Sequence, residues 1–301
     1  MKNKARFGCF LFWVAIGIII SPLAGMAVEE RRVPISGAEL NYIEAGQGRA
    51  VVMIHGNHGS VYIYSATIFD AVSRKYRAVA FDLPGYGKSG RPKSRMTFDE
   101  DAAALHEAFA RLKIEKPVLV GHSMGAPVVL RYLLNYPGEA HAAVLIAPYT
   151  TPFQRIRKTY RVAQVPVVGD LFIWLAIKPM AFFKSAASLT WPAFSPEPVN
   201  EAYAKKEVAL AMRRKNFQFA ARNMYALRNA LREMNGRYGE IKVPVIILAG
   251  DGDLVAPLAE QARPLQEKIP GSKLVVLSHA GHLPFFSKGD EIFKAIDEAA
   301  G

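Results

Sequence analysis

The sequence predicts an α/β fold, in which a mostly parallel β-sheet is flanked by helices and carries a helical cap insertion. Three observations support this prediction. Six short apolar runs are spaced along the chain, and such runs are typical of strands buried on both faces. Helix-length segments lie between most of them, and this alternation favours a parallel sheet covered on both sides. A serine-containing turn joins one of these runs to a helix-like segment.

An antiparallel edge is expected first, at residues 33–44, and the parallel strands follow it. The six apolar runs are Ala50–Ile54, Arg77–Phe81, Pro117–Val120, Ala142–Ile146, Val245–Leu248 and Lys273–Leu277. Between them, Thr97–Leu112 and Pro257–Ile269 have the length and pattern of helices. No internal repeat or low-complexity tract interrupts this order.

One interval breaks the alternation. Between Pro148 and Val243 no run has the character of a buried strand, and apolar clusters such as Leu171–Leu175 take its place. We interpret residues 151–240 as a helical cap over the C-terminal edge of the sheet. The core is then formed by residues 29–150 together with residues 241–301.

The predicted cap is strongly basic, with 15 Lys and Arg against 6 Asp and Glu in residues 151–240, a net charge of +9. Such a charge favours contact with an anionic membrane surface. An alternative stays open, in which the cap aromatics form a core and the lysines a solvated face. The whole chain has a formal net charge of +12. Nucleic acid is not expected as a partner, because no zinc-finger spacing, RNA-binding aromatic motif or basic-region helix occurs.

Residues 1–28 have the pattern of an export signal. Three basic residues precede an uncharged stretch at 7–28, and small residues suggest cleavage near Ala27. The same stretch is long enough for an uncleaved membrane anchor. Either interpretation places the body of the protein outside the cytoplasm, periplasmic, secreted or anchored. The single cysteine, Cys9, lies in this segment, so the remainder has no disulfide and no cysteine-ligated metal.

The turn Gly121-His122-Ser123-Met124-Gly125 carries the first chemical signal. It lies between a strand-like and a helix-like run, and a serine on such a turn stands exposed at the edge of the sheet. Gly121 and Gly125 keep the tight turn free of side chains. The N-terminus of the next helix can stabilise negative charge there. Ser123 is therefore the candidate nucleophile.

A serine nucleophile needs a base that is oriented by a third group. Of seven histidines, we favour His282, which follows the last strand beside a glycine that permits a sharp loop. His279 is the nearby alternative. The orienting acid is expected between serine and histidine in the chain. Asp251 and Asp253 both follow a strand, and we favour Asp253 as the acid and Asp251 as a turn-forming residue.

The developing oxyanion of an acyl-transfer reaction needs hydrogen-bond donors. We expect the backbone N–H groups of Met124 and Asn57 to supply them. Asn57 follows the pair His55-Gly56 at the end of an early strand. His55 is expected to shape this loop through a hydrogen bond, without a direct part in the chemistry.

Together these residues resemble the α/β-hydrolase family, in its serine-nucleophile, esterase- and lipase-like branch. The resemblance runs from about Val33 to Ala299 and is least specific in the cap. The matching blocks are His55-Gly56, Asp82 to Ser89, the turn at Ser123, Gly250-x-x-Asp253 and Gly281-His282. The resemblance implies an eight-stranded sheet, a Ser–Asp–His triad and no required cofactor. The block at His55 is also similar to haloalkane dehalogenases and epoxide hydrolases, but their nucleophile is Asp, and Ser123 argues against both activities.

We therefore expect a serine hydrolase that cleaves a carboxylic ester with a hydrophobic group through an acyl-enzyme intermediate. The expected partner is a small-molecule ester, with no metal and no cofactor, and the oligomeric state stays open. Carbon–carbon bond hydrolysis or perhydrolysis on the same triad is an alternative. A non-catalytic binding protein on the same fold is another, although such proteins usually lose a triad residue and none is missing here.

Overall fold

The computed structural model describes residues 29–91, 97–153, 156, 158–163, 165, 167–177, 179 and 184–301. The expected export segment at 1–28 lies outside the described residues, and its role as a cleaved signal or an anchor stays a prediction. Within the described ranges, no helix combines the length and apolar character needed to span a membrane.

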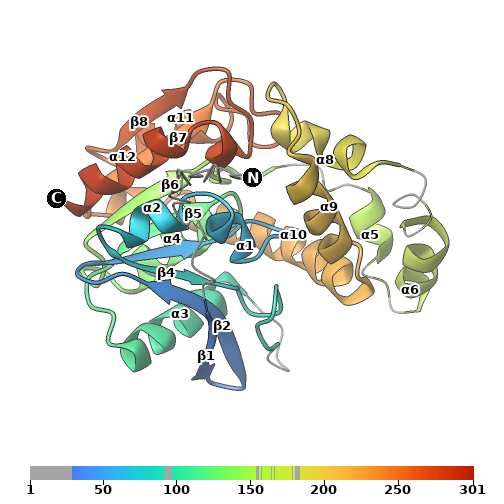
Figure 1. The fold of residues 1–301 in the computed structure, drawn as a ribbon, viewed down its shortest axis with the longest axis horizontal. Helices are drawn as coiled ribbons and strands as arrows, with labels where there is room; N and C mark the ends of the chain where they lie inside the picture. Colours follow the sequence, from blue (N-terminus) through green and yellow to red (C-terminus); the bar gives the residue numbers. More distant parts are fainter. Residues whose placement is uncertain are drawn as a thin grey trace, which may run out of the picture.

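A mostly parallel sheet of eight strands forms the centre of the molecule, as predicted (Figure 1). Its spatial order is β1-β2-β4-β3-β5-β6-β7-β8. Strand β2 is antiparallel to both of its neighbours, and the other pairs are parallel. The strands are β1 Glu30–Ile35, β2 Ala38–Ala45, β3 Ala50–Ile54, β4 Arg77–Phe81, β5 Val118–His122, β6 Ala142–Ile146, β7 Val245–Gly250 and β8 Lys273–Leu277.

Every apolar run that was expected to form a strand does so. Strands β3, β5, β6 and β7 are buried along their whole length, because helices cover both faces of the sheet. Strand β8 lies at the edge and is only partly buried. The antiparallel edge is also present, and it begins at Glu30 instead of Val33.

Helices pack on both faces of the sheet. One apolar cluster joins a sheet face to α3 (Phe98–Leu112), α4 (Gly125–Asn135) and α11 (Ala262–Lys268). The other face packs against α1 (Tyr62–Ser65), α2 (Phe69–Ser73) and α12 (Gly289–Ala300). Because helices cover both faces, the central strands β3, β5, β6 and β7 have no exposed polar side.

The helix expected at 257–269 is shorter than predicted, because α11 begins only at Ala262. Pro264 then lies in the first turn, where its missing N–H costs nothing. A helix from Pro257 would place Pro264 in the interior. Gln261, just before the helix, is buried, and its side-chain carbonyl accepts hydrogen bonds from the backbone of Thr150 and Thr151.

The described residues between β6 and β7 contain only helical elements, and α5, α6, α8 and α9 form the right side of Figure 1. They are α5 Lys158–Ala163, α6 Val168–Phe172, the π-helical η1 Ile173–Ile177, α8 Ala186–Phe194, α9 Glu201–Ala211, α10 Arg214–Met234 and the short η2 Tyr238–Glu240. We call residues 151–240 the cap. A short 3₁₀ helix, η3 (Pro284–Phe286), follows β8.

Helix α10 belongs to two apolar clusters. Near its start, Phe217 and Ala221 pack with α5 and η1 in a small cluster of the cap. Further along, Leu227 and Leu231 are fully buried in the main core. The cap is thus joined to the core through one continuous helix.

Candidate active site

Ser123 lies on a strained turn between β5 and α4. Its φ is +52°, in the left-handed region that costs a residue with a side chain on the order of 1–3 kcal/mol. The turn is held by the Ser123 N–H, which donates to the carbonyl of Ile146 on β6 over 2.9 Å. This backbone lifts the hydroxyl above the C-terminal edge of the sheet.

The glycines around Ser123 are required by close backbone approach. A Cβ at Gly121 would lie 2.7 Å from the Cα of Ala126, and one at Gly125 would lie 2.3 Å from the carbonyl oxygen of Ile54. Both contacts are with backbone, which has little freedom to give way. The structure therefore places these glycines where the tight turn was expected to need them.

Ser123, His282 and Asp253 form a continuous hydrogen-bonded chain. The Ser123 Oγ lies 2.8 Å from His282 Nε2, and His282 Nδ1 lies 2.8 Å from Asp253 Oδ2. Each residue is at most 5 % exposed. Because Asp253 accepts from Nδ1–H, Nε2 is the nitrogen left to accept the serine proton. Three residues far apart in sequence thus meet at one point.

The Asp253 carboxylate is held in its charged form. Burial acts to raise its pKa, but the charge of His282 and hydrogen bonds from His282, Ala256 and Val255 outweigh burial, and the pKa lies below its ordinary value. The two backbone N–H groups donate to Oδ1 over 2.8 and 2.7 Å. This arrangement leaves Oδ2 free to face the imidazole.

The alternative residues lie outside this chain. Asp251 is exposed, and only Asp253 of the two is hydrogen-bonded to His282. His279 is also exposed, and its ring contacts the hydroxyl of the neighbouring Ser278. The structure therefore brings together the pair that the sequence analysis favoured.

The loop after β3 passes beside the Ser123 hydroxyl. A Cβ at Gly56 would lie only 3.3 Å from the Ser123 Oγ, so the absence of a side chain keeps this space open. Asn57 follows directly, and its side-chain oxygen accepts a hydrogen bond from Tyr86 over 2.7 Å. Met124, on the other side, immediately precedes α4. That their backbone N–H groups bind an oxyanion stays a prediction.

His55 shapes this loop through hydrogen bonds. Its Nδ1–H donates to the carbonyl of Gly56 over 2.7 Å, and its Nε2 accepts from the N–H of Leu83 over 3.0 Å. Burial lowers its pKa, against the opposing charge of Asp82. The neutral ring links the loop after β3 to the loop after β4, which is the role that was expected of it.

The block from Asp82 to Ser89 organises the same edge without facing Ser123. The buried Asp82 carboxylate accepts hydrogen bonds from the backbone of Val61 over 2.7 Å and Lys88 over 2.8 Å, and from the Asn41 side chain over 2.8 Å. The conformation of this loop depends on a satisfied buried charge. The matching motif is therefore structural in this chain.

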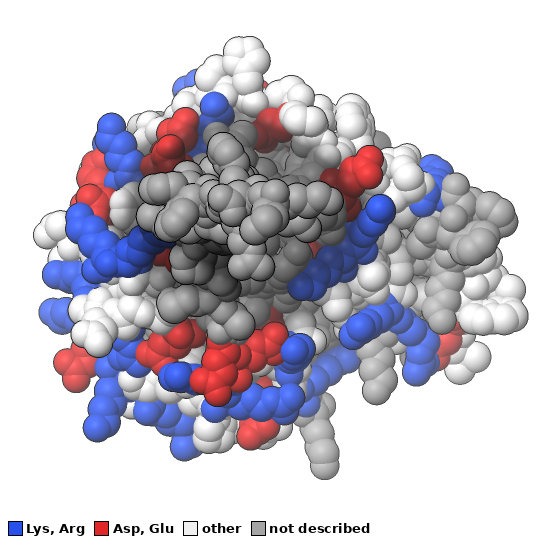
Figure 2. All heavy atoms as spheres, viewed as in Figure 1, with Lys and Arg blue, Asp and Glu red and all other residues white. Residues whose placement is uncertain are grey.

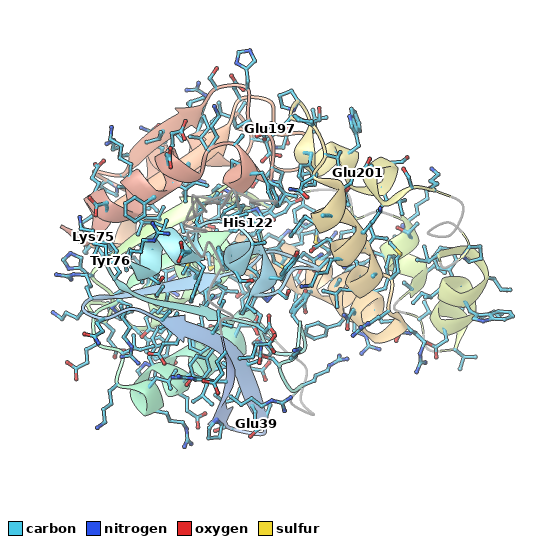
Figure 3. The ribbon with its side chains drawn as sticks, in the orientation of Figure 1. Glu39, Lys75, Tyr76, His122, Glu197 and Glu201 are labelled. Atoms are coloured by element: carbon cyan, nitrogen blue, oxygen red, sulfur yellow. The ribbon has the colours of Figure 1, made fainter. Side chains whose placement is uncertain are left out.

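His122 is a contact that the sequence analysis missed. Figure 3 labels its side chain. The His122 Nε2–H donates to the backbone carbonyl of His282 over 2.9 Å, and the ring packs edge-on against Phe285. Burial, and then the charge of His282, lowers the His122 pKa to about 3. His122 is therefore a neutral donor that positions the loop bearing His282. Its place beside Ser123 was the only available signal.

Two side chains of the cap, Asn223 and Glu197, are hydrogen-bonded to the loops of the site. The Tyr86 hydroxyl, which donates to Asn57, accepts from the side chain of Asn223 on α10 over 2.9 Å. The Glu197 carboxylate, between α8 and α9, accepts from the Gly281 N–H over 2.8 Å and from the Ser287 hydroxyl. These pairs lie far apart in the chain, and no motif marks them.

The geometry suits attack by a serine oxygen. Nε2 of the His282 imidazole can accept the hydroxyl proton, and the buried carboxylate can stabilise the imidazolium that forms. As for metal sites, the described parts of the chain contain no group of three or more His, Cys, Asp or Glu side chains that could hold an ion.

The chain matches known proteins over most of its length. A family model described as the alpha/beta hydrolase fold matches residues 49–289, so the chain belongs to the α/β-hydrolase family, whose members include hydrolases of several kinds. It is 27% identical over 282 residues to a 2-hydroxy-6-oxo-6-phenylhexa-2,4-dienoate hydrolase of Comamonas testosteroni, covering 86% of this chain and 90% of the relative. It is 25% identical over 257 residues to the AB hydrolase superfamily protein YisY of Bacillus subtilis, covering 83% and 90%.

A solved structure of an alpha/beta hydrolase fold protein from Burkholderia ambifaria superposes with a TM-score of 0.76 at 22% identity, covering 89% of this chain and 97% of the other. At this identity the likeness concerns the fold alone. Fold and family thus agree with the resemblance stated from the sequence motifs.

Proposed function

We propose that this hydrolase cleaves a carboxylic ester with a hydrophobic group through an acyl-enzyme intermediate on Ser123. One observation carries the proposal: the buried chain from Ser123 through His282 to Asp253, with both hydrogen bonds at 2.8 Å. This is the arrangement that activates a serine hydroxyl near neutral pH. In this proposal the enzyme needs neither a metal nor a cofactor.

In the first half-reaction, the Ser123 oxygen attacks the ester carbonyl while its proton passes to His282 Nε2. The backbone N–H groups of Asn57 and Met124 stabilise the oxyanion. His282 returns the proton to the leaving alcohol, and the acyl group stays on Ser123. In the second half-reaction, water gives a proton to His282 and attacks the acyl carbon. Collapse of this intermediate releases the acid and restores the serine hydroxyl.

Apolar and aromatic surroundings support a hydrophobic group in the substrate. The Tyr149 ring lies edge-on to His282, with centroids 6.2 Å apart, and next to the Phe153 ring at 6.0 Å. On the other side, the Phe219 ring of α10 packs against Tyr86 at 4.9 Å. We expect an apolar acyl or alcohol group of the substrate to be favoured next to these rings.

A serine-directed fluorophosphonate probe tests the nucleophile. Labelling of the folded protein that is abolished by Ser123→Ala supports the proposal. A folded protein that resists the probe supports a binding protein instead. A panel of p-nitrophenyl esters of increasing acyl length then tests the substrate class, and the ratio kcat/KM should rise from acetate toward medium-chain esters.

Carbon–carbon bond hydrolysis is the second candidate, because the relative from Comamonas testosteroni is named for such a substrate. The two reactions share the triad, so the substrates must separate them. Turnover of a 2-hydroxy-6-oxo-dienoate at a higher kcat/KM than any ester would favour this candidate.

Perhydrolysis, the other alternative, is tested in the same panel of esters. Hydrogen peroxide is added to the acyl-enzyme and the peracid that forms is measured.

A further inference from the structure

One segment of the cap has apolar side chains on opposite sides. Val165 and residues 167–177 form α6 and η1 with the turn before them. On the inner side, Ile173 and Ile177 are buried against Ala163 and Phe217. The outer side chains are 44–78 % exposed, and they are Val165, Val167, Val168, Leu171, Trp174 and Leu175. We call these six side chains the outer face. A helix that is apolar all round is normally covered by protein or by lipid.

The outer face is a concentration of exposed apolar surface. In the described part of the chain, nine large hydrophobic side chains are exposed, and six of them belong to this face. The others are Trp191, Leu254 and Val276, which are scattered in the sequence. Single exposed hydrophobic residues need no explanation, whereas a contiguous group indicates an interaction surface.

The charge around the outer face is positive. Its segment contains one acidic residue, Asp170, and this carboxylate is paired with Arg214 at 2.8 Å. Helix α5, which packs against α6 and α10, exposes Lys158 and Arg161. Arg213, just before α10, is also exposed, and none of these three cations forms an ion pair with another described residue. Figure 2 shows further Lys and Arg side chains over α9 and the adjoining end of α10.

We propose that the outer face docks on an anionic lipid bilayer. Tryptophan is favoured at the boundary between lipid and water, and the surrounding cations complement anionic headgroups. The combination of an apolar face and a cationic rim is typical of segments that lie in the interface without crossing it. A second copy of the chain would supply the apolar surface but would bring the same positive charge, and so it fits the surface less well.

The docking surface is connected to the site by one helix. Tyr160 on α5 is hydrogen-bonded to His58 over 3.0 Å, and His58 lies two residues beyond Gly56, beside Ser123. This hydrogen bond links the loop beside Ser123 to α5, the helix that packs against α6. The docking itself does not depend on the chemistry proposed for Ser123, and each is tested without the other.

The fluorescence of Trp174 provides the test in the full chain. The sequence has three tryptophans, so Trp13→Phe with Trp191→Phe leaves Trp174 as the only reporter. Vesicles of phosphatidylcholine, with or without phosphatidylglycerol, are added, and brominated lipids act as quenchers. We expect a blue shift and quenching with phosphatidylglycerol that weaken as salt rises. Leu171→Ser with Leu175→Ser in this reporter should lower binding by about tenfold or more.

The matched control combines Val276→Trp, on β8 (Figure 1), with Trp13→Phe, Trp174→Phe and Trp191→Phe. Its tryptophan should show neither shift nor quenching. Sedimentation with vesicles while Trp174 stays unshifted would assign binding to another segment, such as 1–28, and would overturn the proposal. A shift that depends on protein concentration without lipid would show a second copy as the occupant. Hydrolysis of a soluble ester, measured in parallel, keeps this result separate from the fate of the proposed function.

Discussion

Glu197 of the cap accepts a hydrogen bond from the backbone N–H of Gly281, the residue before His282, over 2.8 Å. Beside it, the Leu283 N–H donates to the carbonyl of Ala193 over 3.1 Å. The loop that carries the imidazole is thus braced from the cap on both sides of His282, and from the core by His122 (Figure 3).

Because Glu197 holds the loop that carries His282, we predict that Glu197→Ala lowers kcat by about tenfold to a hundredfold with little change in KM. Small displacements of a group that takes part in the reaction are costly. The loss of a partner for the Gly281 N–H should also lower the free energy of unfolding by about 1–3 kcal/mol. Glu197→Gln keeps one acceptor oxygen and should restore most of kcat. Glu201→Ala, on the exposed first turn of α9, is the control, and an equal loss of kcat there would contradict this role.

The carboxylate of Asp253 is predicted to orient the imidazole. Asp253→Asn keeps an oxygen for the N–H groups of Val255 and Ala256 but presents an NH₂ group to His282 Nδ1. This favours the wrong tautomer and should lower kcat by about 10⁴-fold with the fold retained. Steady-state kinetics with circular dichroism checks this. Asp251→Asn should leave kcat unchanged, and a comparable loss in that variant would show that the acid has been misassigned.

Gly56 is predicted to keep the approach to Ser123 open. In Gly56→Ala, the new methyl group would lie 2.9 Å from the Ser123 Cβ and 3.3 Å from its Oγ. We expect kcat/KM to fall by about 10²-fold or more, because substrate and nucleophile can no longer meet at the required distance. Gly236→Ala is the matched control, since a Cβ there meets nothing within 4 Å. Retained ester turnover in Gly56→Ala would argue that the substrate approaches from elsewhere.

The lowered pKa of His122 predicts that the free energy of unfolding decreases in acid. Its pKa is about 3 in the folded protein against an ordinary value of 6.5, so the folded state binds fewer protons. The free energy of unfolding should therefore fall as the pH decreases from about 6.5 toward 3, because the unfolded state takes up the proton first. At pH 5 the loss from His122 should be about 2 kcal/mol relative to neutral pH. Urea unfolding of wild type and His122→Gln at pH 7 and pH 5 measures this.

Glutamine keeps a donor for the His282 carbonyl and removes the titration, so the variant should lose less stability than wild type between the two pH values. His279→Gln, at an exposed ring in the same loop region, serves as the control. Equal acid losses in wild type and His122→Gln would mean that His122 does not govern this part of the profile.

Local patterns were sufficient to predict the sheet and to single out Ser123, Asp253 and His282, which the structure brings together in one hydrogen-bonded chain. A continuous apolar run indicates a buried strand such as Ala142–Ile146, and the order of residues in the chain restricts where an acid and a base can follow the serine. Glu197, Tyr86 and Asn223 could not be found in this way, because their contacts join distant loops and need the cap to be placed. The predicted start of the helix at Pro257 was wrong for a different reason, because Pro264 is tolerated only in the first turn of a helix and α11 begins at Ala262.

Helix α10 has a consequence for how substrate reaches the site. Its 21 residues form a rod about 31 Å long, held by Phe217 at one end and by Leu231 at the other. A swing of the whole cap away from the core would therefore have to bend this helix or expose Leu227 and Leu231, which are fully buried. We therefore expect substrate entry to need rearrangement of α5, α6 and η1 and not of α10, whose Asn223 side chain is hydrogen-bonded to the Tyr86 hydroxyl.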